Sequence, residues 1–230
     1  MPKPVVDVQI WSDVMCPWCA IGYAQFAKAI EQLDGEIEVV TRWMPFELNP
    51  DMPPEGRSQA EHLAQNYQRS DEEIRQMRAR MMAVAERAGF PMAFEGPNGE
   101  AGMMWNTFEA HKLLRWALAV HGPEAQTRLK VALLKAHFQD HRHIGERNVL
   151  LDIAAEQGFD RAAAVAALDE QALAVAVRLE EQRGLEQGIN SVPSFVFAGR
   201  YLVPGAQEPE VYAATLRRIA ALAQGELRNA

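Results

Sequence analysis

Alternating apolar and polar positions predict two strands near the start of the chain. In segment 5–11, Val6, Val8 and Ile10 fall on one side and polar residues separate them. This period of two indicates a strand with one buried face. Segment 36–44 alternates in the same way, and the residues between the two segments repeat apolar side chains at helical spacing. Strand, helix and strand in this order predict a parallel pair of strands joined by a crossover helix.

The long central part of the chain has the pattern of helices. Segment 45–56 holds four prolines, which exclude a regular helix or a central strand, so we interpret it as the loop that leaves the sheet. Alanine, leucine, glutamate and arginine then dominate as far as residue 187, and a loop rich in glycine and proline at 89–102 is the main interruption. Helices are expected near 58–68, 71–88, 103–121, 124–139, 147–157, 160–167 and 170–187.

A strand pattern returns close to the end of the chain. Segment 194–203 contains two short apolar runs joined by a turn with a glycine, which predicts an antiparallel hairpin, and an amphipathic helix is expected over 208–224. The terminal pieces are each too small to stand alone, so we expect them to share one sheet. The predicted α/β organisation has a first half at 1–57, a helical insertion at 58–187 and a second half at 188–230.

Composition and charge exclude several classes of function. The 230 residues carry a net charge of −8, and 48% of them are hydrophobic. This balance is typical of a soluble globular protein, and an acidic chain without a basic run is a poor ligand for nucleic acid or anionic membranes. The chain has no apolar stretch long enough for a membrane span and no apolar signal segment at its start. We therefore expect a cytoplasmic protein, and the sequence does not indicate its oligomeric state.

The chemistry of the chain is concentrated in its two cysteines, Cys16 and Cys19. They fall at the predicted turn from strand to helix, and their three-residue spacing brings the two thiols within reach of each other. The unpaired N–H groups and the positive end of the helix are expected to lower the pKa of Cys16. Pro17 suits the first helical position, where no N–H is needed. Cys16 is then the candidate nucleophile on a disulfide, and Cys19 is the thiol that resolves the mixed disulfide.

Three other interpretations of the cysteine pair stay open. The pair can be half of a zinc site, although no other cysteine exists and His137, His141 and His143 do not complete a clear ligand set. It can be two buried structural thiols, or a pair retained by a protein that no longer cycles it. No catalytic triad, metal pattern or glycine-rich phosphate loop is recognised elsewhere, so no metal and no bound cofactor is expected.

The chain resembles the DsbA-like thioredoxin-fold oxidoreductases, and within them the cytoplasmic FrnE-like branch. Five segments that span most of the chain carry the resemblance: SDVMCPWCAIG at 12–22, FELNPDMP at 46–53, NTFEAH at 106–111, GINSVPSFVF at 188–197 and VPGAQ at 203–207. The resemblance implies a thioredoxin fold in which a large all-helical insertion separates a β-α-β half from a β-β-α half.

The resemblance also implies the residues of a substrate site. The Val192-Pro193 bond should be cis and lie beside the cysteine pair, where the backbone of Val192 can pair with a substrate strand. Trp18, between the cysteines and next to Pro17, is expected to be partly exposed and to touch the partner. His111 is expected to face the active-site groove. Thioredoxin-like proteins often carry a buried acid six residues before the first cysteine, but Ile10 stands there in this chain, so the proton relay for the second cysteine is unassigned.

The first hypothesis is therefore a cytoplasmic protein-disulfide oxidoreductase or isomerase. Its partners are protein or peptide thiols and disulfides, with glutathione or a thioredoxin-type reductant to restore the dithiol. A reducing cytosol favours isomerase or reductase activity over net oxidation. Two alternatives remain. One is a glutathione-dependent isomerase or transferase of the kappa-class or hydroxychromene-carboxylate type, against which the intact cysteine pair counts. The other is a holdase whose client binding would not change in Cys16→Ser.

Overall fold

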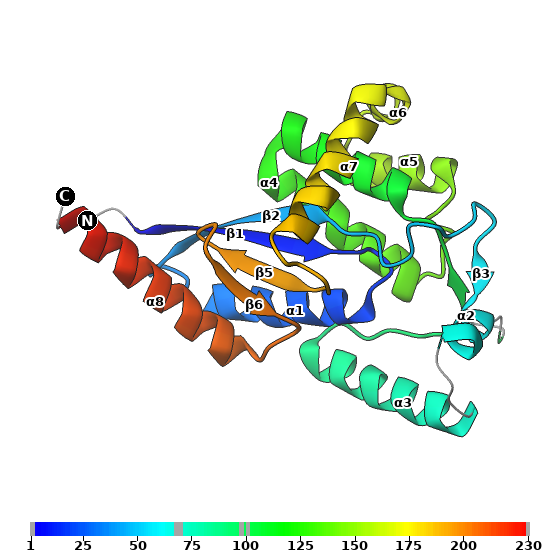
Figure 1. Cartoon of the computed structure of the whole chain (residues 1–230), viewed down its shortest axis with the longest axis horizontal. Helices are drawn as coiled ribbons and strands as arrows, with labels where there is room; N and C mark the ends of the chain where they lie inside the picture. Colours follow the sequence, from blue (N-terminus) through cyan, green and yellow to red (C-terminus); the bar gives the residue numbers. More distant parts are fainter. Residues whose placement is uncertain (1–2, 67–70, 97–98, 100–101, 229–230) are drawn as a thin grey trace.

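The two ends of the chain join in one four-stranded sheet with the order β2-β1-β5-β6 (Figure 1). The computed structural model describes residues 3–66, 71–96, 99 and 102–228. The strands are β1 (Val5–Ser12), β2 (Glu38–Pro45), β5 (Ser194–Phe197) and β6 (Tyr201–Pro204). Strand β1 runs parallel to β2 and antiparallel to β5, and β5 runs antiparallel to β6. The predicted parallel pair, the predicted hairpin and their union in one sheet are therefore confirmed.

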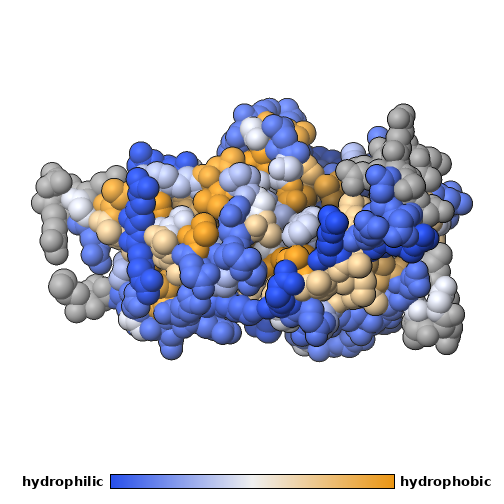
Figure 2. Space-filling view, turned by 90° about the horizontal axis from the view of Figure 1, so that it is seen from below, coloured by the Kyte–Doolittle hydropathy of each residue, from blue (hydrophilic) through white to orange (hydrophobic). Residues whose placement is uncertain are grey.

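Two helices cover one face of this sheet. Helix α1 (Pro17–Gln32) lies beneath β1, and α8 (Pro209–Arg228) packs beside it (Figure 1). The alternation predicted for β1 is present, because Val6, Val8 and Ile10 are buried against these helices. Burial of this apolar surface is the main force that holds the helices on the sheet. On the outer side, the face formed by α8 and α3 carries hydrophilic residues with hydrophobic patches between them (Figure 2).

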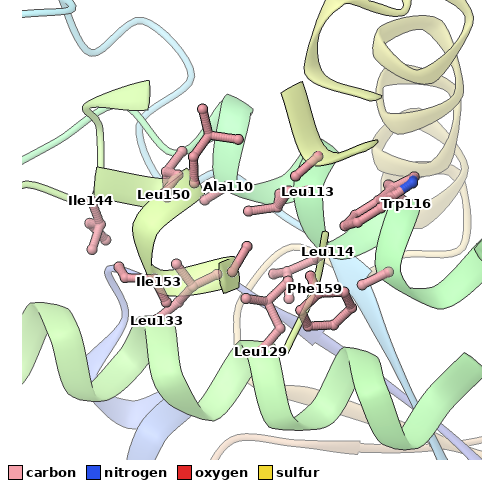
Figure 3. Packing of buried hydrophobic residues seen from close by; sticks show 14 of the residues in the cluster. Ala110, Leu113, Leu114, Trp116, Leu129, Leu133, Ile144, Leu150, Ile153 and Phe159 are labelled. Atoms are coloured by element: carbon pink, nitrogen blue, oxygen red, sulfur yellow. The ribbon is translucent and has the colours of Figure 1, made fainter. Parts of the chain in front are cut away.

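The remaining helices form the block that separates the two halves. They are α2 (Gln59–Asn66), α3 (Asp71–Ala88), α4 (Phe108–Phe138), α5 (Arg147–Glu156), α6 (Arg161–Asp169) and α7 (Gln171–Glu186). The helices α4 to α6 have a core of their own, in which Leu113, Leu129, Leu133, Leu150 and Ile153 meet (Figure 3). The chain is thus an α/β thioredoxin-like fold with a large helical insertion.

Helix α4 is two helical segments joined at Gly122. The φ of Gly122 is 83° and its ψ is 178°, which lies outside the helical region, and Pro123 follows directly. Proline removes a backbone donor and fits the first turn of a new segment. The two predicted helices, 103–121 and 124–139, correspond to these segments. The first of them begins at Phe108 rather than at residue 103.

The insertion is not entirely helical, which corrects the sequence prediction. Strand β3 (Arg57–Ser58) pairs antiparallel with β4 (Met103–Met104) just before α2 and α4 begin. Two residues on each side are too few to give a recognisable alternation of apolar and polar positions. The end of the helix expected at 58–68 lies partly outside the described residues, beyond Asn66.

Side-chain contacts fix the helical block to the sheet, and two of them are close. The Gln126 side chain in α4 pairs with the backbone of Trp43 in β2: its Oε1 accepts from the Trp43 N–H and its Nε2 donates to the Trp43 carbonyl, both at 2.8 Å. In addition, Gly184 in α7 packs directly against the indole of Trp11 in β1. Within the described part of the chain, no helix combines the length and the apolar character that a membrane crossing requires.

Candidate functional site

The two cysteines lie where β1 gives way to α1. Cys16 is the N-cap residue of α1 and Pro17 follows it in the first turn, as the sequence predicted. Both cysteines are free thiols and both are buried, with Cys16 at 4% and Cys19 at 0% exposure. The Cys19 N–H donates to the Cys16 carbonyl over 3.0 Å, which fixes the first turn of the helix. This turn brings the two thiols close enough for each to influence the pKa of the other.

The segment before β5 closes the site from the opposite end of the chain. The Val192-Pro193 peptide bond is cis, as expected. The Cys16 Sγ donates to the Val192 carbonyl oxygen over 3.6 Å. Gly22 of α1 permits this approach, because a Cβ at its position would lie only 3.0 Å from Pro193 Cγ. The structure therefore brings four predicted site residues together: Cys16, Cys19, Val192 and Pro193.

Trp18 forms the exposed side of the site. Its side chain is 44% exposed, as expected, whereas its neighbour Pro17 is half-buried. Trp18 lines a groove of about 500 Å³ whose other wall is α3. Met77, Met81 and Arg80 are among the residues of that wall. A groove of this kind offers both apolar surface and charged groups to a ligand.

The ionisation of the thiol pair differs from the sequence prediction. Burial on its own would raise the pKa of Cys19, but a hydrogen bond from Cys16 and the charge of Lys130 outweigh it, so this pKa is lowered. The pKa of Cys16 is raised by its interaction with the neighbouring Cys19 and by burial. The prediction of a lowered pKa at Cys16 is therefore wrong for the dithiol. The position of Cys16 at the start of a helix suggested a lowered pKa. The structure instead places the charge of Lys130, from α4, where it lowers the pKa of Cys19.

A second polar cluster lies behind the cysteines. Asp13 is buried; its Oδ2 accepts from the Leu48 N–H over 2.7 Å and its Oδ1 from the Met15 N–H over 3.2 Å. The His111 Nε2 is 3.6 Å from Asp13 Oδ1. Burial alone would raise the pKa of Asp13, but the interaction with His111 outweighs it and lowers this pKa. Asp13 is thus held as a carboxylate inside the protein.

His111 itself is only 2% exposed. It is therefore buried, and its role in substrate binding stays a prediction. Its Nε2 has no hydrogen-bond partner among the described residues.

Lys130 is the site residue that sequence reasoning missed. It lies in the second segment of α4, is fully buried, and donates to the Ser12 carbonyl over 3.4 Å. A lysine on a helix is ordinarily exposed, so its type gave no indication of its place. Its neighbours at helical spacing, Gln126 and Leu134, are both buried, but the structure is needed to show this. Lys130 adds a positive charge to the inner side of the thiol pair.

The described residues contain no group of three or more His, Cys, Asp or Glu side chains arranged to hold a metal ion. His137, His141 and His143 lie near one another in sequence, and the ring of His143 stacks on Trp105 with 3.5 Å between the ring centres.

Comparison with known proteins agrees with this architecture. The chain is 30% identical to a probable DsbA oxidoreductase from Streptomyces coelicolor, with a TM-score of 0.80 and coverage of 93% of this chain and 89% of that one. It is 28% identical to the uncharacterized protein YwbO of Bacillus subtilis (strain 168), over 90% of this chain and 94% of YwbO. The cytosolic disulfide reductase DsbM from Pseudomonas aeruginosa, solved with GSH, shares the fold at 20% identity, with a TM-score of 0.59 and coverage of 96% and 99%.

The profile of one protein family describes most of the chain. The DSBA-like thioredoxin domain matches residues 7–217, a span that begins in β1 and ends in α8. These matches do not single out the FrnE-like branch, which stays a prediction. Because the matched span includes the cysteine pair, the helical block and both halves of the sheet, the protein belongs to the family of DSBA-like thioredoxin domains.

Proposed function

We propose that the protein is a thiol–disulfide oxidoreductase in which Cys16 attacks a substrate disulfide and Cys19 resolves the mixed disulfide. The observation that carries the proposal is the pair of free thiols one helical turn apart at the start of α1, with Cys16 against the carbonyl of Val192. Two thiols that share one proton ionise more readily than isolated buried thiols, and the thiolate is the nucleophilic form. This favours a redox pair over two inert structural cysteines.

The reaction begins with a shift of the shared proton. When the dithiol loses one proton to solvent, the negative charge is favoured on Cys19, whose pKa is lowered. Transfer of the proton from Cys16 to Cys19 places the thiolate on Cys16, where the N–H groups of the first helical turn stabilise it. The Cys16 thiolate then bonds to one sulfur of the substrate disulfide, and the other sulfur leaves as a thiolate that takes up a proton from water.

The second step regenerates a free substrate and oxidises the protein. Cys19 loses its proton to solvent and attacks the Sγ of Cys16. The bond between Cys16 and the substrate breaks, the Cys16–Cys19 disulfide forms, and the substrate leaves as a thiolate. Two electrons have then passed from the dithiol to the substrate, and the reverse sequence oxidises a substrate dithiol.

We assign substrate binding to the rim of the site. Trp18 offers the exposed apolar surface beside the pair, and the half-buried Pro17 adjoins it. The Val192-Pro193 segment is the part of the second half of the chain that touches Cys16. An extended peptide that carries a cysteine can lie across both, with its backbone beside Val192. In this proposal, the buried His111 acts on the substrate site indirectly, through its contact with Asp13.

We further propose that the dithiol is restored by glutathione or by a thioredoxin-type protein, and that the protein works in the cytoplasm. The support is the fold shared with the Pseudomonas aeruginosa protein, which is named a cytosolic disulfide reductase and was solved with GSH. In a reducing cytosol the pair is kept mainly as the dithiol, so disulfide reduction or isomerisation is the expected direction.

The test is disulfide exchange with a peptide that contains one labelled disulfide, in wild type, Cys16→Ser and Cys19→Ser. We expect wild type to reduce the peptide and both variants to lose turnover. Cys19→Ser should accumulate a mixed disulfide with the peptide, whereas Cys16→Ser should not, because only Cys16 has contact with the rim of the site. Equal trapping by both variants would contradict the assignment of the nucleophile.

The same assay separates the two alternatives. A holdase would bind an unfolded client equally well as wild type and as Cys16→Ser, and would show no exchange. A glutathione-dependent isomerase would bind glutathione and convert a small aromatic substrate without Cys19. Either result, together with absent exchange in wild type, would overturn the proposed function.

A further inference from the structure

Helices α1 and α3 form a groove that the proposed reaction steps do not use. Helix α3 shares an apolar cluster with α1 through Ala85 and Ala88, which are both buried. Closer to the start of α3, Met77 and Met81 are only partly buried, and they line the groove together with Trp18 of α1. The groove, of about 500 Å³, is therefore built on a region where α3 packs firmly on the helix that carries the cysteines.

The residues of α3 that line the groove combine apolar and charged side chains. Met77, Met81 and Val84 follow one another at helical spacing and are partly buried, whereas Glu73 and Arg80 are exposed. The two exposed residues carry opposite charges, so they do not favour one net charge in a ligand. Hydrophobic residues also lie between hydrophilic ones on this face of the molecule (Figure 2). Methionine side chains are flexible and adapt to apolar groups of different shapes.

The groove begins at the cysteine pair. Trp18 lies between Cys16 and Cys19 in the first turn of α1, and its side chain is 44% exposed. Helical geometry places the Cα atoms of Cys16 and Trp18 about 5–6 Å apart. Packed helices have axes about 8–10 Å apart, and an extended peptide advances about 3.3 Å per residue. A side chain about two to four residues from a cysteine attacked by Cys16 can therefore reach the groove.

We propose that Trp18, Met77 and Met81 form a substrate subsite that binds a large apolar side chain close in sequence to the substrate cysteine. The inference rests on the proposed function and deepens it, because it names the substrate class as segments of unfolded protein. Cysteine is among the most buried residue types in folded proteins. Its neighbours in a sequence therefore commonly include apolar residues that become exposed when the chain unfolds. Glutathione has no large apolar side chain and is not expected to occupy the groove.

The first test compares three peptides that each carry one cysteine in a labelled mixed disulfide. One has leucine three residues before the cysteine, one has leucine three residues after it, and one has serine at both places. The measured quantity is the ratio of each leucine rate to the serine rate within the same protein. We expect wild type to favour at least one leucine peptide by about fivefold or more, because its side chain leaves water in the groove. In the double variant Met77→Ser, Met81→Ser, this ratio should fall below about twofold.

Met82→Ser is the matched control. Met82 adjoins Met81 on α3 and is 39% exposed, but it is not among the described residues that line the groove. This variant should keep the wild-type ratio. A wild-type ratio near one, or an equal fall in the double variant and in Met82→Ser, would overturn this inference while exchange itself persists. The absence of exchange with every peptide in wild type would instead overturn the proposed function.

A second measurement leaves α3 unaltered and covers the case in which the double variant does not fold. Cys19→Ser is joined to each peptide as a mixed disulfide at Cys16, and the methionine methyl groups are followed by carbon-13 NMR. We expect the signals of Met77 and Met81 to shift with a leucine peptide and to respond much less to the serine peptide, while Met82 changes little with either. Equal responses of Met77 and Met81 to all three peptides would contradict the proposal. Shifts of these signals with protein concentration alone would assign the groove to a second copy of the chain and would also overturn it.

Discussion

The Sγ of Cys16 donates a hydrogen bond to the carbonyl oxygen of Val192, although 176 positions separate the two residues. The contact joins the first and second halves of the chain across the inserted helices. A substrate that reaches Cys16 therefore meets the backbone of Val192, from the second half, at the same time. The site depends on the correct union of the two halves in one sheet, so interactions that fix the helical block to the sheet are expected to affect both stability and activity.

Because Gly184 packs against Trp11, we expect its replacement by alanine to destabilise the protein, the opposite of the usual effect in a helix. Replacing a helical glycine by alanine ordinarily stabilises a helix by about 0.5–1 kcal/mol. At Gly184, however, a Cβ would lie 2.4 Å from the buried Trp11 ring. We expect Gly184→Ala to destabilise the protein by about 1–3 kcal/mol in chemical denaturation.

The control is Gly225→Ala in α8, where a Cβ would meet nothing within 4 Å. This variant should be neutral or slightly stabilising. A Gly184→Ala protein as stable as Gly225→Ala would show that α7 does not pack on β1 in the way described.

The pairing of Gln126 with the Trp43 backbone predicts a large loss of stability in Gln126→Met. Methionine keeps the volume but leaves a buried N–H and a buried carbonyl of β2 without partners. The expected cost is about 2–4 kcal/mol in the free energy of unfolding. Gln182→Met is the comparison, because Gln182 is exposed on α7 and binds only Glu186. A cost below that of Gln182→Met would argue against the role of Gln126.

Glu47 predicts a specific pH dependence of stability. Its side chain is 2% exposed and pairs with Arg178. Burial, with a smaller contribution from Glu181, raises its pKa from the ordinary 4.5 to about 7. A raised carboxyl pKa means that folding favours the protonated form, so the stabilisation is complete below about pH 4.5 and is lost as the pH rises through 7.

The measurement is the free energy of unfolding of wild type and Glu47→Gln at several pH values. Between about pH 5 and pH 8, wild type should lose about 1–2 kcal/mol of stability relative to the variant. This is less than the full pKa shift of Glu47 implies, because its partner Arg178 is partly exposed and solvent screens the pair. Parallel pH profiles for the two proteins would mean that Glu47 ionises normally.

Trp18 predicts a selective effect on substrates. Because its side chain is 44% exposed, Trp18→Ala should leave the free energy of unfolding almost unchanged. It should slow exchange with a peptide disulfide several-fold more than exchange with hydroxyethyl disulfide, since only the peptide can cover the apolar rim. Tyr201→Ala, which removes a comparably exposed aromatic side chain from β6, should slow neither reaction. An equal loss for both substrates would place Trp18 outside substrate docking.

The sheet and the cysteine pair could be predicted because their signals are local. The alternation of Val6, Val8 and Ile10 is a property of a few neighbouring residues, and so is the spacing of Cys16 and Cys19. The break between the two segments of α4 was also predictable from the sequence near Gly122. These features do not depend on which distant segments come together.

The electrostatics of the site could not be predicted in the same way. The lowered pKa of Cys19 depends in part on the charge of Lys130, which is buried near Ser12 only through the packing of α4 on the sheet. The burial of His111 beside Asp13 depends on the same packing. The β3–β4 pair was missed because four residues are too few to show a pattern.

The most direct test of the account is a titration of the purified protein in glutathione redox buffers, with the thiols trapped by alkylation at each step and Cys16→Ser as the control. We predict a single two-electron transition between the dithiol and a Cys16–Cys19 disulfide in wild type, and no such transition in the variant. The absence of an intramolecular disulfide at every redox poise would contradict the central claim that these two cysteines are a redox pair.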